Sequence, residues 1–104
     1  MERETALPTA QRKTKLPADH EYSRLSDAEL IPLVEDNTTA FSELYERYYH
    51  RVFYYLLDIV RNLTEAEDLT SQTFLSAFAS LGKLKRKESF SAWLFRIARN
   101  KAND

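Results

Sequence analysis

The sequence predicts an all-α fold, a compact bundle of three main helices with a short N-terminal helix before them. Apolar residues recur at the i, i+3, i+4, i+7 spacing of a helix over most of residues 39–101. The 104 residues include a single glycine, whereas the tight turns of a hairpin-rich β fold need several residues that accept positive φ. Capping patterns that start helices occur at Ser26 and at Thr64.

The N-terminal part of the chain predicts a tail followed by a short helix. Residues 1–24 show little apolar periodicity and hold two of the three prolines, so we expect a disordered or loosely held tail before a helical domain at 25–104. Ser26 and Glu29 form a capping box that predicts the first helix start. Pro32 lacks an amide donor and disfavours a helical residue before it, so we expect a break or kink there.

Two long helices are expected next. The first covers residues 39–61, and its apolar stripe is Phe41, Leu44, Tyr45, Tyr48, Val52, Tyr55, Leu56 and Ile59. The second begins at Thr64, where Thr64 and Glu67 form a capping box, and is expected to stop at Gly82. Its stripe is Ala66, Leu69, Thr73, Phe74, Ala77 and Leu81.

The last helix is expected to start near Ser89, after a basic loop at 83–89. Its inner face is Phe90, Trp93, Leu94, Ile97 and Lys101. We expect four rings to anchor the core, namely Phe41, Phe74, Phe78 and Trp93. For most of these aromatics, core packing is a better explanation than ligand stacking.

Composition excludes several classes of site. The chain has no cysteine, and its two histidines, His20 and His50, stand alone, so we expect no disulfide, no metal and no cofactor. One glycine is too few for a phosphate-binding or dinucleotide loop. No acid/base pair or activated nucleophile is visible, so we expect a protein that is not an enzyme. No apolar run reaches the roughly 20 residues of a membrane span, which favours a cytoplasmic protein.

Charge is unevenly distributed, although the net charge is only −1. Residues 26–70 carry three basic and ten acidic side chains, a net charge of −7. Residues 83–104 carry seven basic and two acidic side chains, a net charge of +5. This layout suits two partners of opposite character, the basic end facing nucleic acid and the acidic part facing a basic protein surface. From the charges alone, the favoured explanation is that they only keep a small domain soluble.

Three polar groups remain once the inner faces are removed. Asp68, Ser71, Gln72 and Leu75 share a face of the third helix, which suits docking onto a helical partner, or is a solvated face with one exposed leucine. The basic loop, with Lys83, Lys85, Arg86 and Lys87, suits phosphate contacts. The fourth helix carries Arg96, Arg99 and Asn100 at helical spacing, which suits base and phosphate contacts or a solvated face.

Four motifs occur in order: Ala-Phe-x-x-Leu-Tyr at 40–45, Ala-Glu-Asp-Leu-Thr at 66–70, Thr-Phe-Leu at 73–75, and Phe-x-Ala-Trp-Leu-Phe-Arg-Ile-Ala-Arg-Asn at 90–100. Over about residues 25–104, the chain resembles region 2 of bacterial sigma-70 RNA polymerase sigma factors, with the extracytoplasmic-function (ECF) type as the nearest group. The resemblance implies a transcription initiation module that binds polymerase and promoter DNA. It performs no bond chemistry itself.

The resemblance also implies two sets of site residues. In the family, the third helix docks on the clamp helices of the polymerase β′ subunit, here through Asp68, Ser71, Gln72 and Leu75. The following loop and helix capture the non-template strand of the minus-ten promoter element, melt the duplex and hold a flipped base. The implied DNA-binding residues are Lys83, Lys85, Arg86, Lys87, Ser89, Phe90, Arg96, Arg99 and Asn100.

The sequence departs from the family pattern in two places. Many relatives have Gln-Glu before Thr-Phe, whereas this chain has Ser71-Gln72, which removes a carboxylate from the polymerase-facing surface. Family members usually continue to a helix-turn-helix region 4, which has no counterpart in these 104 residues, so we expect a part of a longer factor. ECF relatives are often held by an anti-sigma factor, and a protein-interaction module with little DNA binding of its own is therefore the alternative function.

Overall fold

The computed structural model describes residues 19–85 and 89–104. The elements in chain order are α2 (Asp19–Tyr22), α3 (Asp27–Leu30), the 3-10 helix η2 (Ile31–Asp36), α4 (Thr38–Val60), α5 (Leu63–Ala79), the 3-10 turn η3 (Leu81–Lys83) and α6 (Phe90–Asn103). Within these ranges no strand occurs, and the predicted all-α bundle of three main helices is confirmed.

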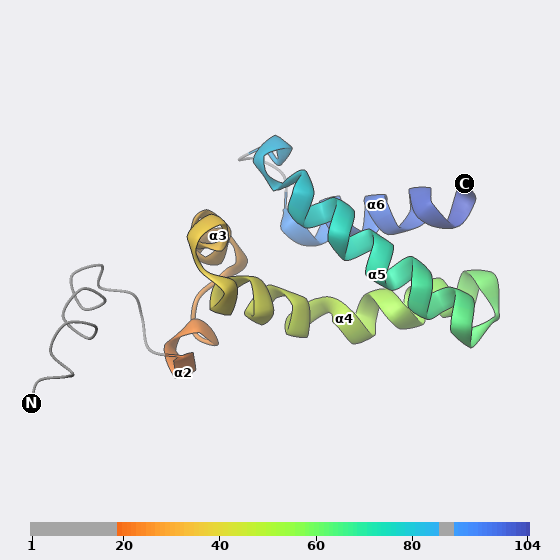
Figure 1. Cartoon of the computed structure of the whole chain (residues 1–104), viewed down its shortest axis with the longest axis horizontal. Coiled ribbons are helices and arrows are strands. Elements are labelled where there is room, and N and C mark those ends of the chain that lie inside the picture. Colours follow the sequence, from red (N-terminus) through yellow and green to blue (C-terminus); the bar gives the residue numbers. More distant parts are fainter. Residues whose placement is uncertain (1–18, 86–88) are drawn as a thin grey trace, which may run out of the picture.

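The three long helices form the body of the molecule. In Figure 1, α4 lies along the long axis, α5 folds back across it, and α6 runs beside α5 towards the C-terminus. Helix α5 contacts both α4 and α6, while α2, α3 and η2 gather at the N-terminal end of α4. Among the described helices, none is long and apolar enough to cross a membrane.

Residues 19–36, here called the N-terminal arm, start before the expected domain boundary at residue 25. Residues 1–18, the larger part of the predicted tail, lie outside the described residues. Residues 19–22 form α2, and the Tyr22 side chain is only 2% exposed. Its hydroxyl accepts a hydrogen bond from Asn37 Nδ2 at the start of α4. The packed part of the chain therefore includes residues that the sequence pattern alone placed in the tail.

The first helix begins and ends where the sequence predicts. Glu29 N–H donates to Ser26 Oγ at 3.1 Å, and Ser26 N–H donates to Glu29 Oε1 at 2.8 Å, which completes the capping box. Helix α3 ends at Leu30, and the chain tightens into η2 with Pro32 in its first turn. The break at Pro32 follows from its missing amide donor.

The connection between α4 and α5 differs from the prediction. Arg61 adopts a left-handed conformation, with φ 56°, and its N–H donates to the Leu57 carbonyl at 2.8 Å. The next residue, Asn62, is the N-cap of α5, and its side chain accepts from Glu65 N–H at 2.8 Å. The predicted capping box at Thr64 is therefore wrong, because the turn places Asn62 two residues earlier in the capping position.

The end of α5 also differs from the prediction. The helix stops at Ala79, three residues before Gly82, and the chain continues into η3. Gly82 has no positive φ, so it is not the left-handed terminator that the sequence suggested. The amide of Ser80 instead closes the helix by donating to the carbonyls of Ser76 and Ala77 at 3.0 and 3.2 Å.

Large side chains from α4 and α6 pack against small ones on α5. The buried apolar core comprises Tyr22, Leu30, Ala40, Leu44, Tyr48, Val52, Leu56, Ala66, Phe74, Ala77, Phe90, Trp93, Leu94 and Ala98. Thr70 and Thr73 are also buried, and each hydroxyl donates to the carbonyl four residues earlier at 2.7 Å. These bonds satisfy both buried threonine hydroxyls.

Two of the four expected ring anchors are buried. Phe74 and Trp93 lie in the core, as predicted. Phe78 is half-buried, and Phe41 is 36% exposed, so the expectation for Phe41 is wrong. The Phe41 ring packs against Phe78, with ring centroids 4.0 Å apart, so the contact between α4 and α5 continues beyond the buried core.

Candidate functional surfaces

The residues predicted to dock on a protein partner share the outer side of α5. Asp68, Ser71, Gln72 and Leu75 are all exposed, and Leu75 is 72% exposed. Gln72 Nε2 donates to Asp68 Oδ2 at 2.8 Å, one helical turn away. This group, the α5 face, therefore combines an apolar side chain with a fixed amide–carboxylate pair.

The inner side of α5 packs against the core. Phe74 is buried next to the exposed Leu75, and its ring lies 4.8 Å from Tyr45 of α4. Leu69 also packs against the core, as the sequence predicts. Burial, followed by the neighbouring Tyr49, raises the pKa of Tyr45. Contacts such as that between Phe74 and Tyr45 hold the inner side of α5 against α4. The outward side chains of α5 do not contribute to the core.

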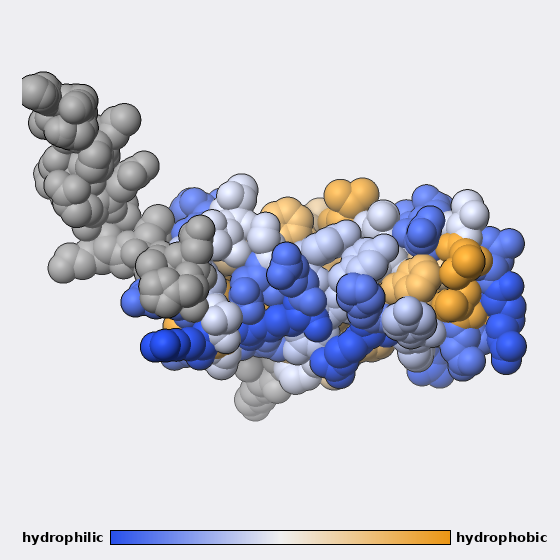
Figure 2. Space-filling view, turned by 90° about the horizontal axis from the view of Figure 1, so that it is seen from below, coloured by the Kyte–Doolittle hydropathy of each residue, from blue (hydrophilic) through white to orange (hydrophobic). Residues whose placement is uncertain are grey.

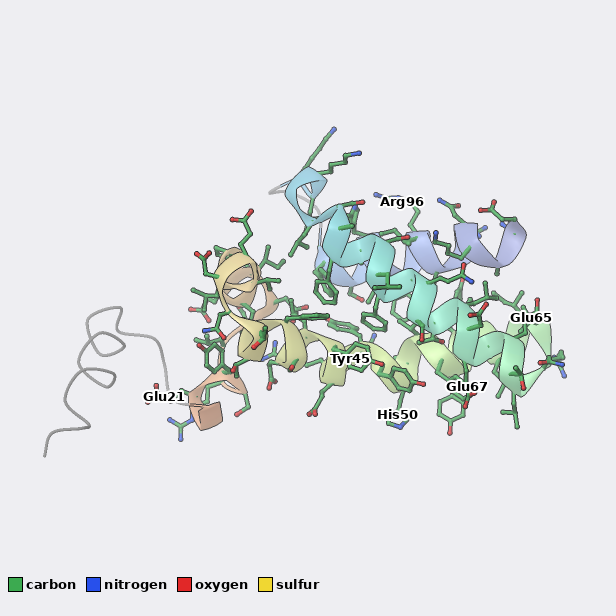
Figure 3. The ribbon with its side chains drawn as sticks, in the orientation of Figure 1. Glu21, Tyr45, His50, Glu65, Glu67 and Arg96 are labelled. Carbon is green, nitrogen blue, oxygen red and sulfur yellow. The ribbon has the colours of Figure 1, made fainter. Side chains whose placement is uncertain are left out.

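Exposed basic side chains lie on η3, on the segment after it and on α6. Lys83, Lys85, Arg96, Arg99 and Asn100 are exposed, and we call this group the basic surface. In Figure 3, Arg96 projects from the edge formed by α6, while His50 projects from α4 on the opposite edge. Arg86 and Lys87 were predicted to join this group but lie outside the described residues.

Ser89 and Phe90 have structural roles at the start of α6. The Ser89 side chain accepts from Ala92 N–H at 2.9 Å and is the N-cap. Phe90 is 2% exposed and packs between Tyr48 and Trp93, with ring centroids 5.4 and 6.1 Å away. The ring therefore packs in the core and also lines a pocket, and its contact with DNA stays a prediction.

A pocket of about 600 Å³ lies between the N-terminal arm and the start of α6. One wall consists of residues from α3, its N-cap and η2: Ser26, Asp27, Ala28, Ile31 and Pro32. The other consists of Leu84, Lys85, Ser89 and Phe90. This volume lies within the range of roughly 300–1,000 Å³ for small-molecule sites. Sequence reasoning missed the pocket because its walls are more than 50 residues apart in the chain.

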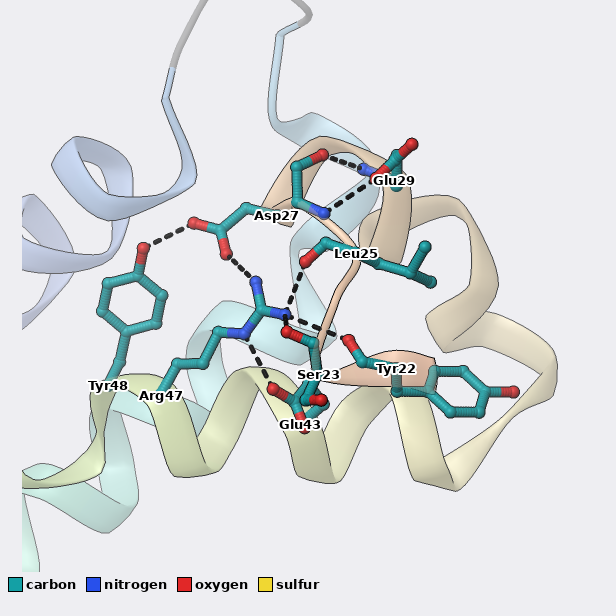
Figure 4. A network of polar contacts seen from close by, with 9 residues as sticks. Tyr22, Ser23, Leu25, Asp27, Glu29, Glu43, Arg47 and Tyr48 are labelled. Carbon is teal, nitrogen blue, oxygen red and sulfur yellow. Dashed lines mark hydrogen bonds and ion pairs between the residues drawn. The ribbon is translucent and has the colours of Figure 1, made fainter. Parts of the chain in front are cut away.

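Arg47 binds the N-terminal arm to α4, as Figure 4 shows. Its guanidinium donates to Asp27 Oδ1 and to Glu43 Oε2, both at 2.9 Å. It also reaches three backbone carbonyls of the arm, those of Tyr22, Ser23 and Leu25. We call these contacts, together with the bond from Tyr48 to Asp27, the polar clamp.

Tyr48 completes the polar clamp from the next position of α4. Its hydroxyl donates to Asp27 Oδ2 at 2.5 Å. Burial, followed by this bond, raises the pKa of Tyr48. Burial by itself would lower the pKa of Arg47, but the bonds to Glu43 and Asp27 raise it. Both donors therefore stay protonated at neutral pH and hold the Asp27 carboxylate from two sides.

The described residues contain no group of three or more histidine, aspartate or glutamate side chains placed to hold a metal ion. The described residues instead form contact surfaces of different chemical character. The α5 face is mixed polar and apolar, the basic surface is cationic, and the pocket lies beside Lys85.

Comparison with known proteins matches residues 44–104 to the sigma-70 region 2 family. The chain is 30% identical over 79 residues to the RNA polymerase sigma-H factor of Pseudomonas aeruginosa, covering 75% of this chain and 41% of that protein. It is 39% identical over 82 residues to the ECF RNA polymerase sigma factor BldN of Streptomyces coelicolor, covering 74% and 31%. It is 43% identical over 65 residues to the RNA polymerase sigma factor CarQ of Myxococcus xanthus, covering 62% and 37%.

The chain thus spans 31–41% of the length of these three relatives. The family match includes most of α4 and all of α5, η3 and α6, and so contains both the α5 face and the basic surface. The order of four motifs in the sequence and the all-helical fold agree with this match. The chain belongs to the sigma-70 family as a region 2 domain of the ECF type.

Proposed function

We propose that this domain acts in bacterial transcription initiation by docking on RNA polymerase through the α5 face and capturing unpaired promoter DNA on the basic surface. The polymerase contact is the pair of clamp helices of the β′ subunit. The DNA contact is the non-template strand of the minus-ten element. One observation supports this proposal: of the side chains that the family resemblance assigns to contacts, those that the structure describes are exposed apart from Phe90, while the core behind them is buried.

The chemistry of the α5 face suits a helical protein partner. Leu75 offers an exposed apolar side chain that is removed from water on docking, which stabilises a complex. Gln72 stands one turn and Asp68 two turns from Leu75, and both can bond polar groups around that leucine. A central apolar residue with a polar rim is the usual arrangement of a small protein interface. The glutamine at 72 keeps a hydrogen-bonding group where many relatives carry a carboxylate.

The basic surface suits an unpaired strand. Lysine and arginine side chains bind phosphates without regard to sequence, and this attraction weakens as salt rises. Separating a duplex costs about 1.4 kcal/mol of stacking per step, so a protein promotes melting by binding the strand once it is unpaired. The pocket beside Lys85 is the part of this surface that can receive an unstacked base. We assign the strand contacts to the cations and to the pocket, in which the mostly buried Phe90 forms part of the wall.

The first test is a titration of the domain against isolated β′ clamp helices. Replacing Asp68 and Leu75 by alanine together is expected to weaken binding about tenfold or more, because both side chains lie on the α5 face. The matched control replaces Glu67 and Leu63, another exposed acid and another exposed leucine of α5, by alanine. Equal affinity of the two folded double variants would refute the α5 face as the docking site.

A salt titration tests the basic surface. Removing Lys83, Lys85 and Arg96 is expected to lower the slope of log affinity against log salt by about 0.7 for each phosphate that the variant no longer binds. Arg24→Ala, which removes an exposed cation from the N-terminal arm, serves as the control and should leave the slope nearly unchanged. An unchanged slope in the triple variant would exclude strand binding by this surface.

The alternative is a module held by an anti-sigma factor, with little DNA binding of its own. Its support is the number of exposed large apolar side chains on α4 and α5: Phe41, Tyr54, Ile59, Leu63 and Leu75. Figure 2 shows an apolar patch on the end of the molecule that carries the α4–α5 turn, away from the pocket. Reversing the charges in the basic loop distinguishes the two functions. The charge reversal should abolish strand capture if the domain binds promoter DNA, and should change only solubility if the domain is a module held by an anti-sigma factor.

A further inference from the structure

The two walls of the pocket carry opposite charges. Lys85 contributes an exposed ammonium group from the segment before α6, and Asp27 contributes a carboxylate from α3. Apolar parts of Ile31, Pro32 and Leu84 also line the space. A ligand that fits this arrangement has a flat apolar body, a negative charge at one end and a hydrogen-bond donor at the other.

The Asp27 carboxylate is fixed in place but retains bonding capacity. Arg47 holds Oδ1 at 2.9 Å and Tyr48 holds Oδ2 at 2.5 Å, so the side chain is clamped from α4. A carboxylate offers about four acceptor positions, of which these bonds use two. The side chain keeps 26% of its surface exposed. Asp27 is therefore an oriented acceptor whose free positions a ligand can reach.

We propose that Asp27 selects the base that enters the pocket, accepting a hydrogen bond from the exocyclic amino group of cytosine or adenine. This inference rests on strand capture by the basic surface. The nucleotide phosphate lies on the side of Lys85, and the edge of the base points across the pocket towards Asp27. Arg47 and Tyr48 act as positioning residues, because they touch the carboxylate and not the base.

Thymine fits the pocket in size but fails this chemistry. Where cytosine carries an amino donor at position 4, thymine carries a carbonyl oxygen. Two acceptors facing each other leave the carbonyl without its water and without a replacement bond. Asp27 thus rejects thymine more than it attracts the amino-bearing bases, which is how a site that bonds one functional group excludes an analogue lacking it.

The test compares single-stranded oligonucleotides of about ten thymidines with the same strands carrying one central cytosine or adenine. The 104-residue chain is titrated against each labelled strand. We expect the single amino-bearing base to tighten binding at least about fivefold, the low end of discrimination by one good base contact. A strand carrying 2-pyrimidinone, which has the cytosine ring without its amino group, should bind no more tightly than oligothymidine.

Asp27→Asn tests the residue itself, because it removes the charge and replaces one acceptor oxygen by an amide donor while keeping the shape. The preference for cytosine is expected to disappear. Glu29→Gln is the matched control, since it removes a carboxylate from the same short helix, outside the pocket lining, and a glutamine oxygen can still complete the capping box. It should retain the full preference, although both variants gain some affinity for every strand.

Tyr48→Phe distinguishes a direct contact from a displaced wall. Tyr48→Phe removes one of the two bonds that hold Asp27 but leaves the carboxylate. We therefore expect the logarithm of the affinity ratio between the cytosine-containing strand and oligothymidine to keep at least half of its value. Loss of the preference in Tyr48→Phe as complete as in Asp27→Asn would overturn direct selection by the carboxylate. Equal binding of all strands by the unaltered chain would overturn selection alone and leave strand capture standing. No binding of any strand would remove strand capture as well.

Discussion

Helices α4, α5 and α6 meet through interlocking apolar side chains, whereas the N-terminal arm adds the polar clamp to two buried apolar residues and several partly buried ones. In the helical body, rings such as Phe74 and Trp93 are enclosed between helices. In the arm, Tyr22 and Leu30 are buried, but one guanidinium fixes the path of the chain through its carbonyls. The two parts therefore depend on different kinds of interaction.

This difference predicts different stabilities for the two parts. Apolar packing is shared among many neighbours, so the helical body should unfold as a whole. A short segment held by a few apolar side chains and one partly exposed guanidinium can open locally at lower cost, because fewer contacts must break together. The arm forms one wall of the pocket, so its opening also dismantles the proposed base site.

The largest effect is expected from Trp93→Ala in the helical body. The Trp93 side chain is 7% exposed, and removing a buried ring costs about 3–5 kcal/mol, because its packing disappears and a cavity is left behind. Denaturant unfolding followed by circular dichroism measures this loss. Tyr54→Ala is the control, because that ring is 60% exposed and its removal should change stability by about 0.5 kcal/mol or less. Similar losses in both variants would contradict the assignment of Trp93 to the core.

A smaller effect is expected from Arg47→Met, which keeps an apolar stem and removes the polar clamp. The free energy of unfolding should fall by about 2 kcal/mol, less than for a fully buried ion pair because the site is partly exposed. Hydrogen exchange of the Leu30 and Ile31 amides reports opening of the arm, and exchange of the Phe74 amide reports the body. In the unaltered chain, the opening free energy measured at the arm amides should already be lower than that measured at the Phe74 amide.

After Arg47→Met, the amides of the arm and the body should lose protection by the same amount, because global unfolding also breaks the clamp. The arm amides should then be almost unprotected. Arg51→Met, which removes only a cation–π contact to Tyr48 and Phe95 from the same helix, is the control and should change both sites little. Identical opening free energies for arm and body in the unaltered chain would show that they unfold only together.

The sequence predicted the helices and the outward faces because these depend on neighbours within one or two turns. The capping box at Ser26, the break at Pro32 and the helix start near Ser89 are local features, and all three are confirmed. The exposure of Leu75 follows in the same way from its position opposite the buried stripe of α5.

The polar clamp and the pocket were beyond prediction from local patterns. Glu43 and Arg47 are four residues apart and could be recognised as a helical pair. Asp27 is 20 residues from Arg47, so its contact depends on how the arm folds back. Phe90 was predicted both on the inner face of its helix and, by the family resemblance, in contact with DNA. Its ring packs against Tyr48, a partner that local patterns could not identify.

The smallest effect, about 1 kcal/mol, is expected from removing helix caps, and it separates the two regions most sharply. Asn62→Ala removes the cap of α5, which stays intact when only the arm opens. It should therefore lower the protection of the Phe74 amide and leave that of the Leu30 amide unchanged. Ser26→Ala removes the cap of α3, which breaks in both kinds of opening, so it should lower both.

Thr64→Ala is the control for Asn62→Ala, since Thr64 lies in the first turn of α5 and Asn62 accepts the capping bond. Thr64→Ala should change the opening free energy measured at the Phe74 amide by no more than a few tenths of a kcal/mol, because the capping bond stays in place. If Asn62→Ala lowered the protection of the Leu30 amide as much as that of the Phe74 amide, the arm could open only when α5 also unfolds. The pocket would then be as stable as the core, and its wall would owe its position to the whole fold rather than to Arg47 and Tyr48.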